Sequence, residues 1–200
     1  MDEFATKLGN LGFQLPKWCL PPSKDLVCEF EERFSLNLPS DYRDFLVRFG
    51  GFWSGDGAVC PCQEPTPCGN SALIESFFGF TLPTRHDNVM DETEKIDGYP
   101  DVIAIGDNLM GGMFWLKCIG SDAGHVYLFD NQGRFAWPDE MFFHMFPNLH
   151  PEIRTYLELR RKGKLPRKAK GYEHIYRVAT SFSEFIDRLE PGTTDSTTSP

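Results

Sequence analysis

Three short apolar runs, separated by turn-forming residues, constrain the fold of this chain more than any other feature. The runs are Asp101–Asp107, Met113–Cys118 and His125–Asp130, and clusters of Gly, Asp and Asn separate them. Runs of branched and aromatic residues with this punctuation predict consecutive antiparallel strands joined by tight turns, a meander. In the third run Val126 and Leu128 alternate with aromatic residues, so both faces of the sheet carry apolar side chains. We therefore expect other elements to cover both faces.

Helical patterns flank this meander on both sides, so we expect an α+β fold. The predicted architecture is an antiparallel β-meander sheet of about five to six strands packed against N-terminal and C-terminal helices. Ser23 precedes a helical pattern through Phe34, and Ser181 with Glu184 forms a capping box before another. The other predicted helices are 39–49, with Gly50 at its end, 88–96, 138–146 and 151–163, and the other predicted strands are 73–80 and 134–137.

Two hundred residues are enough for one core of good size, and we expect one domain. Residues 1–22 form a lead segment with Phe13 and Trp18 as possible anchors. The predicted parts of the rest are a domain over 23–190, a loop insertion at 51–71, a basic helical insertion at 139–172 and a disordered tail at 191–200. The loop is so rich in Gly, Pro and Cys that we expect no helix or strand of ordinary length in it.

Three segments, in order, carry a resemblance to a known family. The first is Leu38–Leu46, a leucine-proline helix followed by Gly50-Gly51. The second is Ile105-Gly106-Asp107, a Gly-Gly turn and then Gly124-x-Val126-Tyr127-x-x-Asp130, and the third is Ser181–Ile186. This pattern resembles the SUKH superfamily, the Knr-type group of bacterial immunity proteins and fungal cell-wall regulators. The family usually has a polar residue where this chain has Phe49.

The resemblance implies a function that the residues alone do not reveal. Many members are immunity proteins that bind a cognate toxin domain, such as a nuclease, inside the producing cell and block it stoichiometrically. We therefore expect an immunity protein that is not an enzyme and needs no cofactor. A regulatory scaffold of the same family is one alternative, and a zinc-binding or nucleic-acid-associated protein is a second.

Acidic side chains gather before and within the meander. They are Asp87, Asp91, Glu92, Glu94, Asp97, Asp101 and Asp107. Such a run is commonly a solvated face, but an acidic face also steers and holds a basic partner. These residues are the predicted partner-binding site.

A basic strap, residues 154–170, contrasts with this face. It carries a local charge of +7 within a net charge of −9, so the remaining 183 residues carry −16. Charge and composition disfavour nucleic acid as a partner, because the acidic body would repel a polyanion and the strap lacks interleaved aromatic residues. A connector folded against the acidic surface is the simpler interpretation, and its role stays open.

Three cysteines in the 51–71 loop, Cys60, Cys62 and Cys68, are the candidate metal ligands. A fourth ligand from Cys19, Cys28 or His86 would complete a tetrahedral zinc site. The usual Cys-x-x-Cys pairs are missing, and three reduced thiols without metal are the alternative.

Local catalytic motifs are also missing. No histidine lies in a His-Glu-x-x-His helix and no serine in a Gly-x-Ser-x-Gly elbow, while Gly106–Gly112 fits a hairpin turn better than a phosphate-binding loop. The N-terminus has no secretory signal pattern, and no apolar run reaches the roughly 20 residues of a membrane span. We expect a soluble, cytoplasmic protein whose oligomeric state the sequence does not reveal.

Overall fold

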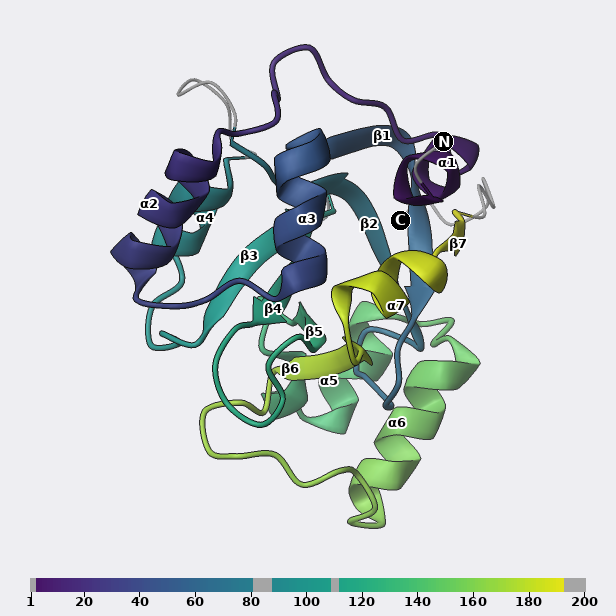
Figure 1. The fold of residues 1–200 in the computed structure, drawn as a ribbon. Coiled ribbons are helices and arrows are strands. Elements are labelled where there is room, and N and C mark those ends of the chain that lie inside the picture. Colours follow the sequence, from purple (N-terminus) through teal and green to yellow (C-terminus); the bar gives the residue numbers. More distant parts are fainter. Residues whose placement is uncertain (1–2, 81–87, 109–111, 193–200) are drawn as a thin grey trace.

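A computed structural model describes residues 3–80, 88–108 and 112–192 (Figure 1). The helices are α1 (Glu3–Asn10), α2 (Lys24–Phe34), α3 (Ser40–Phe49), α4 (Val89–Glu94), α5 (Asp139–Met145), α6 (Pro151–Arg161) and α7 (Phe182–Asp187), with a 3-10 helix η1 (Arg134–Ala136). The strands are β1 (Phe52–Pro61), β2 (Ser71–Phe77), β3 (Val102–Asp107), β4 (Met113–Lys117), β5 (Val126–Phe129), β6 (Ile175–Ala179) and β7 (Glu190–Pro191). The α+β prediction is confirmed.

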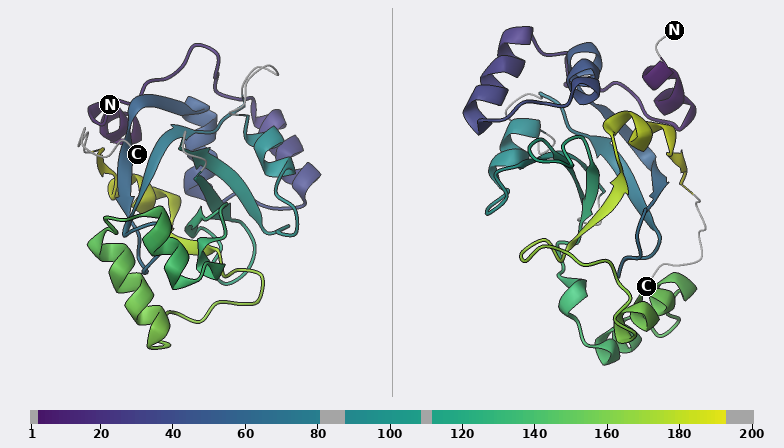
Figure 2. Two further views of the ribbon diagram at one scale, coloured as in Figure 1. Left: turned by 180° about the vertical axis from the view of Figure 1, so that it is seen from behind. Right: turned by 60° about the horizontal axis from the view of Figure 1, so that its bottom comes forward.

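The strands form one antiparallel sheet in the order β6-β5-β4-β3-β2-β1-β7. The predicted meander is its centre, β3-β4-β5, and the seven strands slightly exceed the predicted number. The sheet curls, and α1, α2, α3 and α7 lie over one face of it (Figures 1 and 2). We call this the inner face and the opposite one the outer face.

The main core fills the space between the inner face and these helices. Phe45 of α3 and Phe182 of α7 are fully buried, and their ring centroids are 4.9 Å apart. Phe77 of β2 completes this aromatic centre, 5.8 Å from Phe45. Aromatic side chains dominate the core because each buries a large apolar area.

The predicted helix boundaries follow local capping chemistry. The Ser23 hydroxyl accepts the N–H of Leu26 at 3.2 Å at the start of α2, and the Ser181 hydroxyl accepts that of Glu184 at 3.0 Å at the start of α7. Gly50 ends α3 with φ 77°, a backbone conformation that side chains with a Cβ rarely adopt. These predictions are confirmed.

The prediction of irregular chain over residues 51–71 is wrong for its first half, which forms the long strand β1. The pairing with β2 shifts register between Trp53 and Ala58, and Gly57 adopts φ 69° there. The Ser54 hydroxyl accepts the N–H groups of Asp56 and Gly57 across this irregularity. The glycines that were expected to prevent a strand are thus accommodated by a bulge within it.

The structure also differs from the predictions elsewhere. Residues 134–137 are not a strand: Asp130, which is buried, accepts the N–H of Arg134 at 2.6 Å and bends the chain into η1. Strand β6 and helix α1 of the lead segment were not predicted; α1 buries Leu8, and Phe13, one of the two anchors named from the sequence, is also in the core. Of the predicted tail, Pro191 pairs with Ala58 in the sheet, and residues 193–200 lie outside the described part.

The basic helical insertion has a small core of its own. Phe142 of α5 packs with Ile153, Tyr156 and Leu157 of α6, and with Leu149 between the two helices. Both helices lie at one end of the sheet, away from α2 and α4 (Figure 1). Four large apolar side chains of this insertion remain at least one third exposed: Met141, Phe143, Met145 and Phe146.

Candidate partner-binding site

Helix α4, which carries Asp91, Glu92 and Glu94 of the predicted acidic face, is fixed to the edge of β3. Strands β2 and β3 pair at Ser76 with Asp107 and at Phe77 with Gly106, and no strand among the described residues pairs with the rest of β3 on that side. The Thr93 hydroxyl accepts the N–H of Ala104 at 3.2 Å in that gap. Asn88 caps the helix by accepting the N–H of Met90 at 2.9 Å. These contacts hold the acidic side of α4 in a defined position.

A small apolar pocket of about 190 Å³ lies between the end of α4 and the outer face of the sheet. Its lining residues come from α4 and the segment after it, from β4 and β5, and from the turn before β6: Glu92, Lys95, Ile96, Asp97, Tyr99, Met113, Trp115, Phe129 and His174. The rings of Trp115 and Phe129 stack with centroids 4.1 Å apart. The pocket therefore has an aromatic floor and two carboxylates at its margin.

A hydrogen-bond chain fixes one wall of this pocket. The Tyr99 hydroxyl donates to the carbonyl oxygen of Gly171 and lies 2.8 Å from Nε2 of His174. Because that hydroxyl has one proton, the contact with His174 requires the imidazole to donate through Nε2. Burial lowers the pKa of His174, although Glu173 and Asp130 act in the opposite direction. The imidazole is therefore neutral at pH 7.

This lowered pKa of His174 predicts a loss of stability in mild acid. Below the usual histidine range the unfolded chain binds a proton more readily than the folded protein, so the free energy of unfolding falls as pH falls. Urea unfolding at pH 7.5 and pH 5.5 measures this dependence. The wild type should lose more stability between these values than His174→Gln, and equal losses in both proteins would contradict the assignment.

The structure separates the predicted acidic residues into distinct places. Glu92 and Asp97 line the pocket, whereas Asp91 is exposed on α4 and does not line it. Glu94 pairs with Arg33 of α2. Asp101 and Asp107 lie at opposite ends of β3, and Asp87 lies outside the described residues.

Several of these carboxylates are already engaged within the protein. Glu92 forms an ion pair with Lys95 at 2.5 Å. Asp101 pairs with Lys117, and Asp107 accepts the hydroxyl of Ser76 at 2.6 Å. Within residues 3–80, 88–108 and 112–192, neither Asp91 nor Asp97 forms an ion pair. Of the predicted acidic face, Asp91 and Asp97 therefore remain available to bind a partner, together with Glu92, whose charge is partly neutralised by Lys95.

The cysteines of the 51–71 segment are neighbours, but they do not form a ligand set in the described structure. Cys60 is buried in β1, Cys62 follows it, and the Cys68 sulfur accepts a hydrogen bond from Arg134 at 3.1 Å. In the part of the chain that the structure describes, no three His, Cys, Asp or Glu side chains converge as metal ligands do. Of the candidate fourth ligands, Cys19 is buried, Cys28 is exposed on α2, and His86 lies outside the described residues.

Burial keeps these thiols protonated, which predicts their reactivity. It raises the pKa of Cys60 to about 12 and that of Cys68 to about 11, and it also raises the pKa of Cys62. Because thiolates react and thiols do not, a disulfide reagent at pH 8 should modify the native protein rapidly at the exposed Cys28. Cys28→Ser should abolish this fast phase, whereas rapid modification of Cys60, Cys62 or Cys68 would contradict the prediction.

The basic strap folds against the body of the protein. Arg160 and Arg161 both pair with Asp139, and Lys168 pairs with Glu64 at 2.6 Å. The Lys168 ammonium also donates to the carbonyl oxygen of Ile175 at 2.6 Å. A large part of its positive charge is therefore used within the protein, partly by α5 of the same insertion and partly by Glu64 of the segment after β1.

A comparison with protein-family models shows to which family the chain belongs. Residues 21–188 match the SMI1/KNR4 family (SUKH-1). The chain belongs to this family. A search of curated proteins and a search of solved structures found no match. The family match spans the core helices α2, α3 and α7 and the strands β1 to β6, and the pocket below α4 lies within it.

Sequence reasoning located the acidic half of this SUKH-1 candidate site but missed its aromatic half. Trp115 and Phe129 occupy alternate positions that point to the outer face, so strand periodicity could have found them. Tyr99 and His174 belong to connecting segments, and their sequence gives no such signal. None of the described helices has the length and apolar character of a membrane span.

Proposed function

We propose that this SUKH-1 protein is an immunity protein, which binds the catalytic domain of a cognate toxin and blocks it stoichiometrically. One observation carries the proposal: Asp97, which forms no ion pair in the described structure, lines the aromatic pocket below α4 together with Glu92, and the exposed Asp91, also without an ion pair there, is the residue next to Glu92. An apolar centre with a charged margin is the usual anatomy of a protein-binding surface.

The geometry favours a partner that presents a lysine or arginine. The long aliphatic part of such a side chain fits an apolar pocket of about 190 Å³, while its charged end stays at the carboxylates of the margin. Nuclease active sites collect basic residues because they bind phosphates. A protein that covers these residues excludes the substrate, so inhibition requires no cofactor and no chemistry by the inhibitor itself.

The direct test is co-expression with the toxin domain encoded by the neighbouring gene. The wild type should restore growth and bind the purified domain in a one-to-one complex. The double variant Asp91→Lys, Asp97→Lys should weaken binding by about 100-fold, because reversing two charges replaces attraction by repulsion. Calorimetry measures the affinity, and survival of the co-expressing cells measures protection.

A matched control separates a local effect from the change in net charge. Asp56→Lys, Asp187→Lys changes the charge by the same amount at two exposed positions on β1 and α7, on the other side of the molecule (Figure 1). This control should bind almost as the wild type does. Equal weakening by both double variants, or full protection by Asp91→Lys, Asp97→Lys, would exclude the α4 site and leave the exposed apolar side chains of α5 to be examined.

A further inference from the structure

A second and larger cavity lies on the outer face, on the far side of Tyr99 and Tyr172. Its volume is about 540 Å³, within the range of about 300 to 1,000 Å³ typical of small-molecule sites. It lies between the strands β4 to β6 and residues 166–172 of the chain before β6, and the segment after β1 closes one side. None of the predicted partner-binding residues lines it.

The acidic side chains of this cavity are already bound within the protein. Glu64 pairs with Lys168 at 2.6 Å, and Asp122 accepts the hydroxyl of Tyr127 at 2.7 Å. Lys117, a further lining residue, is held by Asp101. These pairs shape the walls and cancel most of the charge of the lysines.

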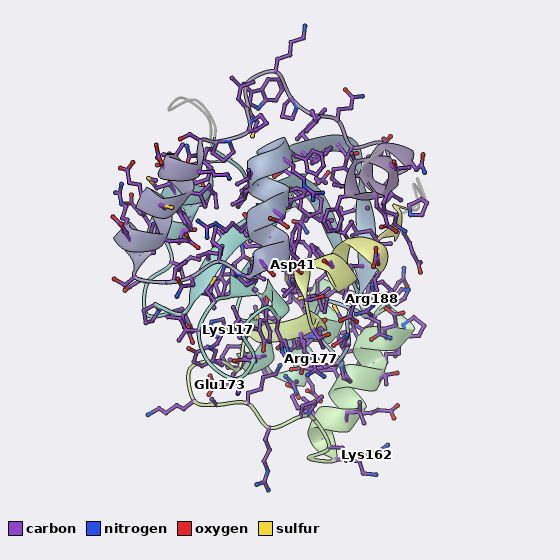
Figure 3. The ribbon with its side chains drawn as sticks, in the orientation of Figure 1. Asp41, Lys117, Lys162, Glu173, Arg177 and Arg188 are labelled. Carbon is purple, nitrogen blue, oxygen red and sulfur yellow. The ribbon has the colours of Figure 1, made fainter. Side chains whose placement is uncertain are left out.

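Two arginines of the lining remain. Arg177 projects from β6 on the outer face, directly across from Tyr127 of β5, and Arg167 projects from the segment that covers the strands. Both are exposed, and neither forms an ion pair with the residues that the structure describes. Figure 3 labels Arg177 and Lys117, which both line the cavity. The guanidinium groups of these two arginines are therefore the main hydrogen-bond donors of the cavity that remain available to a ligand.

We propose that this cavity is a binding site for a small organic anion, whose phosphate or carboxylate is held by Arg167 and Arg177. Guanidinium groups bind such anions through paired hydrogen bonds, which makes arginine the preferred residue for this recognition. The Tyr127 and Tyr172 rings, with Ile175 and Pro166, supply apolar walls for the body of the ligand.

The charge of the whole protein restricts the size of this anion. The net charge is −9, so a polyanion such as RNA would extend from the cavity over repulsive surface. A monophosphate or a short dicarboxylate ends within the cavity and avoids this repulsion. The site is independent of the proposed toxin interface, because the two pockets share no lining residue.

Calorimetric titration with three probes tests the proposal. Adenosine monophosphate represents an organic phosphate, N-acetylaspartate represents a carboxylate, and adenosine is the uncharged control. At least one of the two anions should bind saturably, and the preferred one identifies the source of the negative charge. Arg177→Gln should weaken this binding by about 10-fold to 100-fold, the loss typical of one charged hydrogen-bonding group.

Lys170→Gln is the matched control, since it removes one positive charge from an exposed position on the same segment but outside the cavity. It should change the affinity less than 2-fold, which is about 0.4 kcal/mol. Saturable binding of neither anion, equal binding of adenosine, or equal effects of the two substitutions would overturn the proposal.

Discussion

Replacing Phe45 by alanine is expected to reduce the free energy of unfolding by about 4 kcal/mol, which is a large share of the stability of a domain of this size. Phe45 is fully buried in α3, and six other aromatic rings have centroids within 6.5 Å of its own. Their residues are in α1, α3, β1, β2 and α7. A cavity at this position would therefore weaken contacts among five elements at once.

Urea denaturation followed by circular dichroism measures this loss. Phe143→Ala is the matched control, because Phe143 has the same side chain but is 43% exposed on α5. We expect a change of about 0.5 kcal/mol or less for the control. Similar effects of the two substitutions would mean that the aromatic centre does not hold the helices on the sheet.

The second large effect is expected at Gly106, where Gly106→Ala should cost about 3 kcal/mol. A Cβ at this position would lie 2.3 Å from the carbonyl oxygen of Ser76, so the backbones of β2 and β3 would have to move apart. Gly106 forms one of the two pairs between these strands, and the β3-β4 register shifts at the same position. The substitution therefore strains the junction between the two halves of the sheet.

Gly9→Ala provides the control for this prediction. Gly9 lies in α1, and a Cβ there would meet no atom within 4 Å. Because alanine favours a helix over glycine, this variant should be neutral or up to about 1 kcal/mol more stable than the wild type. A neutral Gly106→Ala would show that β2 and β3 are joined less tightly than their geometry indicates.

The junction at Gly106 also matters for the candidate partner-binding site. Helix α4 occupies the edge of β3 that β2 leaves open, and the Thr93 hydroxyl binds the backbone there. A change in the angle between the two halves of the sheet would shift α4, and with it Asp91 and Asp97. Gly106→Ala should therefore lower the affinity for a partner bound at α4 as well as the stability of the fold.

The elements that the sequence predicted well depend on interactions within a few residues. Helices α2 and α7 begin at Ser23 and Ser181 because each hydroxyl caps an N–H three residues later. The meander follows from turn residues between short apolar runs. The family resemblance rested on the same local segments, and the match over residues 21–188 confirms it.

The features that the sequence did not predict depend on contacts between distant residues. Strand β1 persists through its glycines because β2 and β7 pair with it on both sides, and β6 forms beside β5, which lies about 50 residues earlier in the chain. Likewise, no local pattern brings His174 to Tyr99, or Arg177 to the strap that precedes it.

The fold class, the family and the presence of an acidic face could thus be predicted from the amino-acid sequence, because periodicity, capping and charge patterns depend on residues close together in the chain. The tertiary structure decided that Glu94 and Asp101 are engaged, since their partners Arg33 and Lys117 come from α2 and β4, whereas Glu92 pairs locally with Lys95 three residues later. It also decided where the two cavities lie, because each is enclosed by strands and connections that meet only when the sheet curls and the chain crosses its outer face.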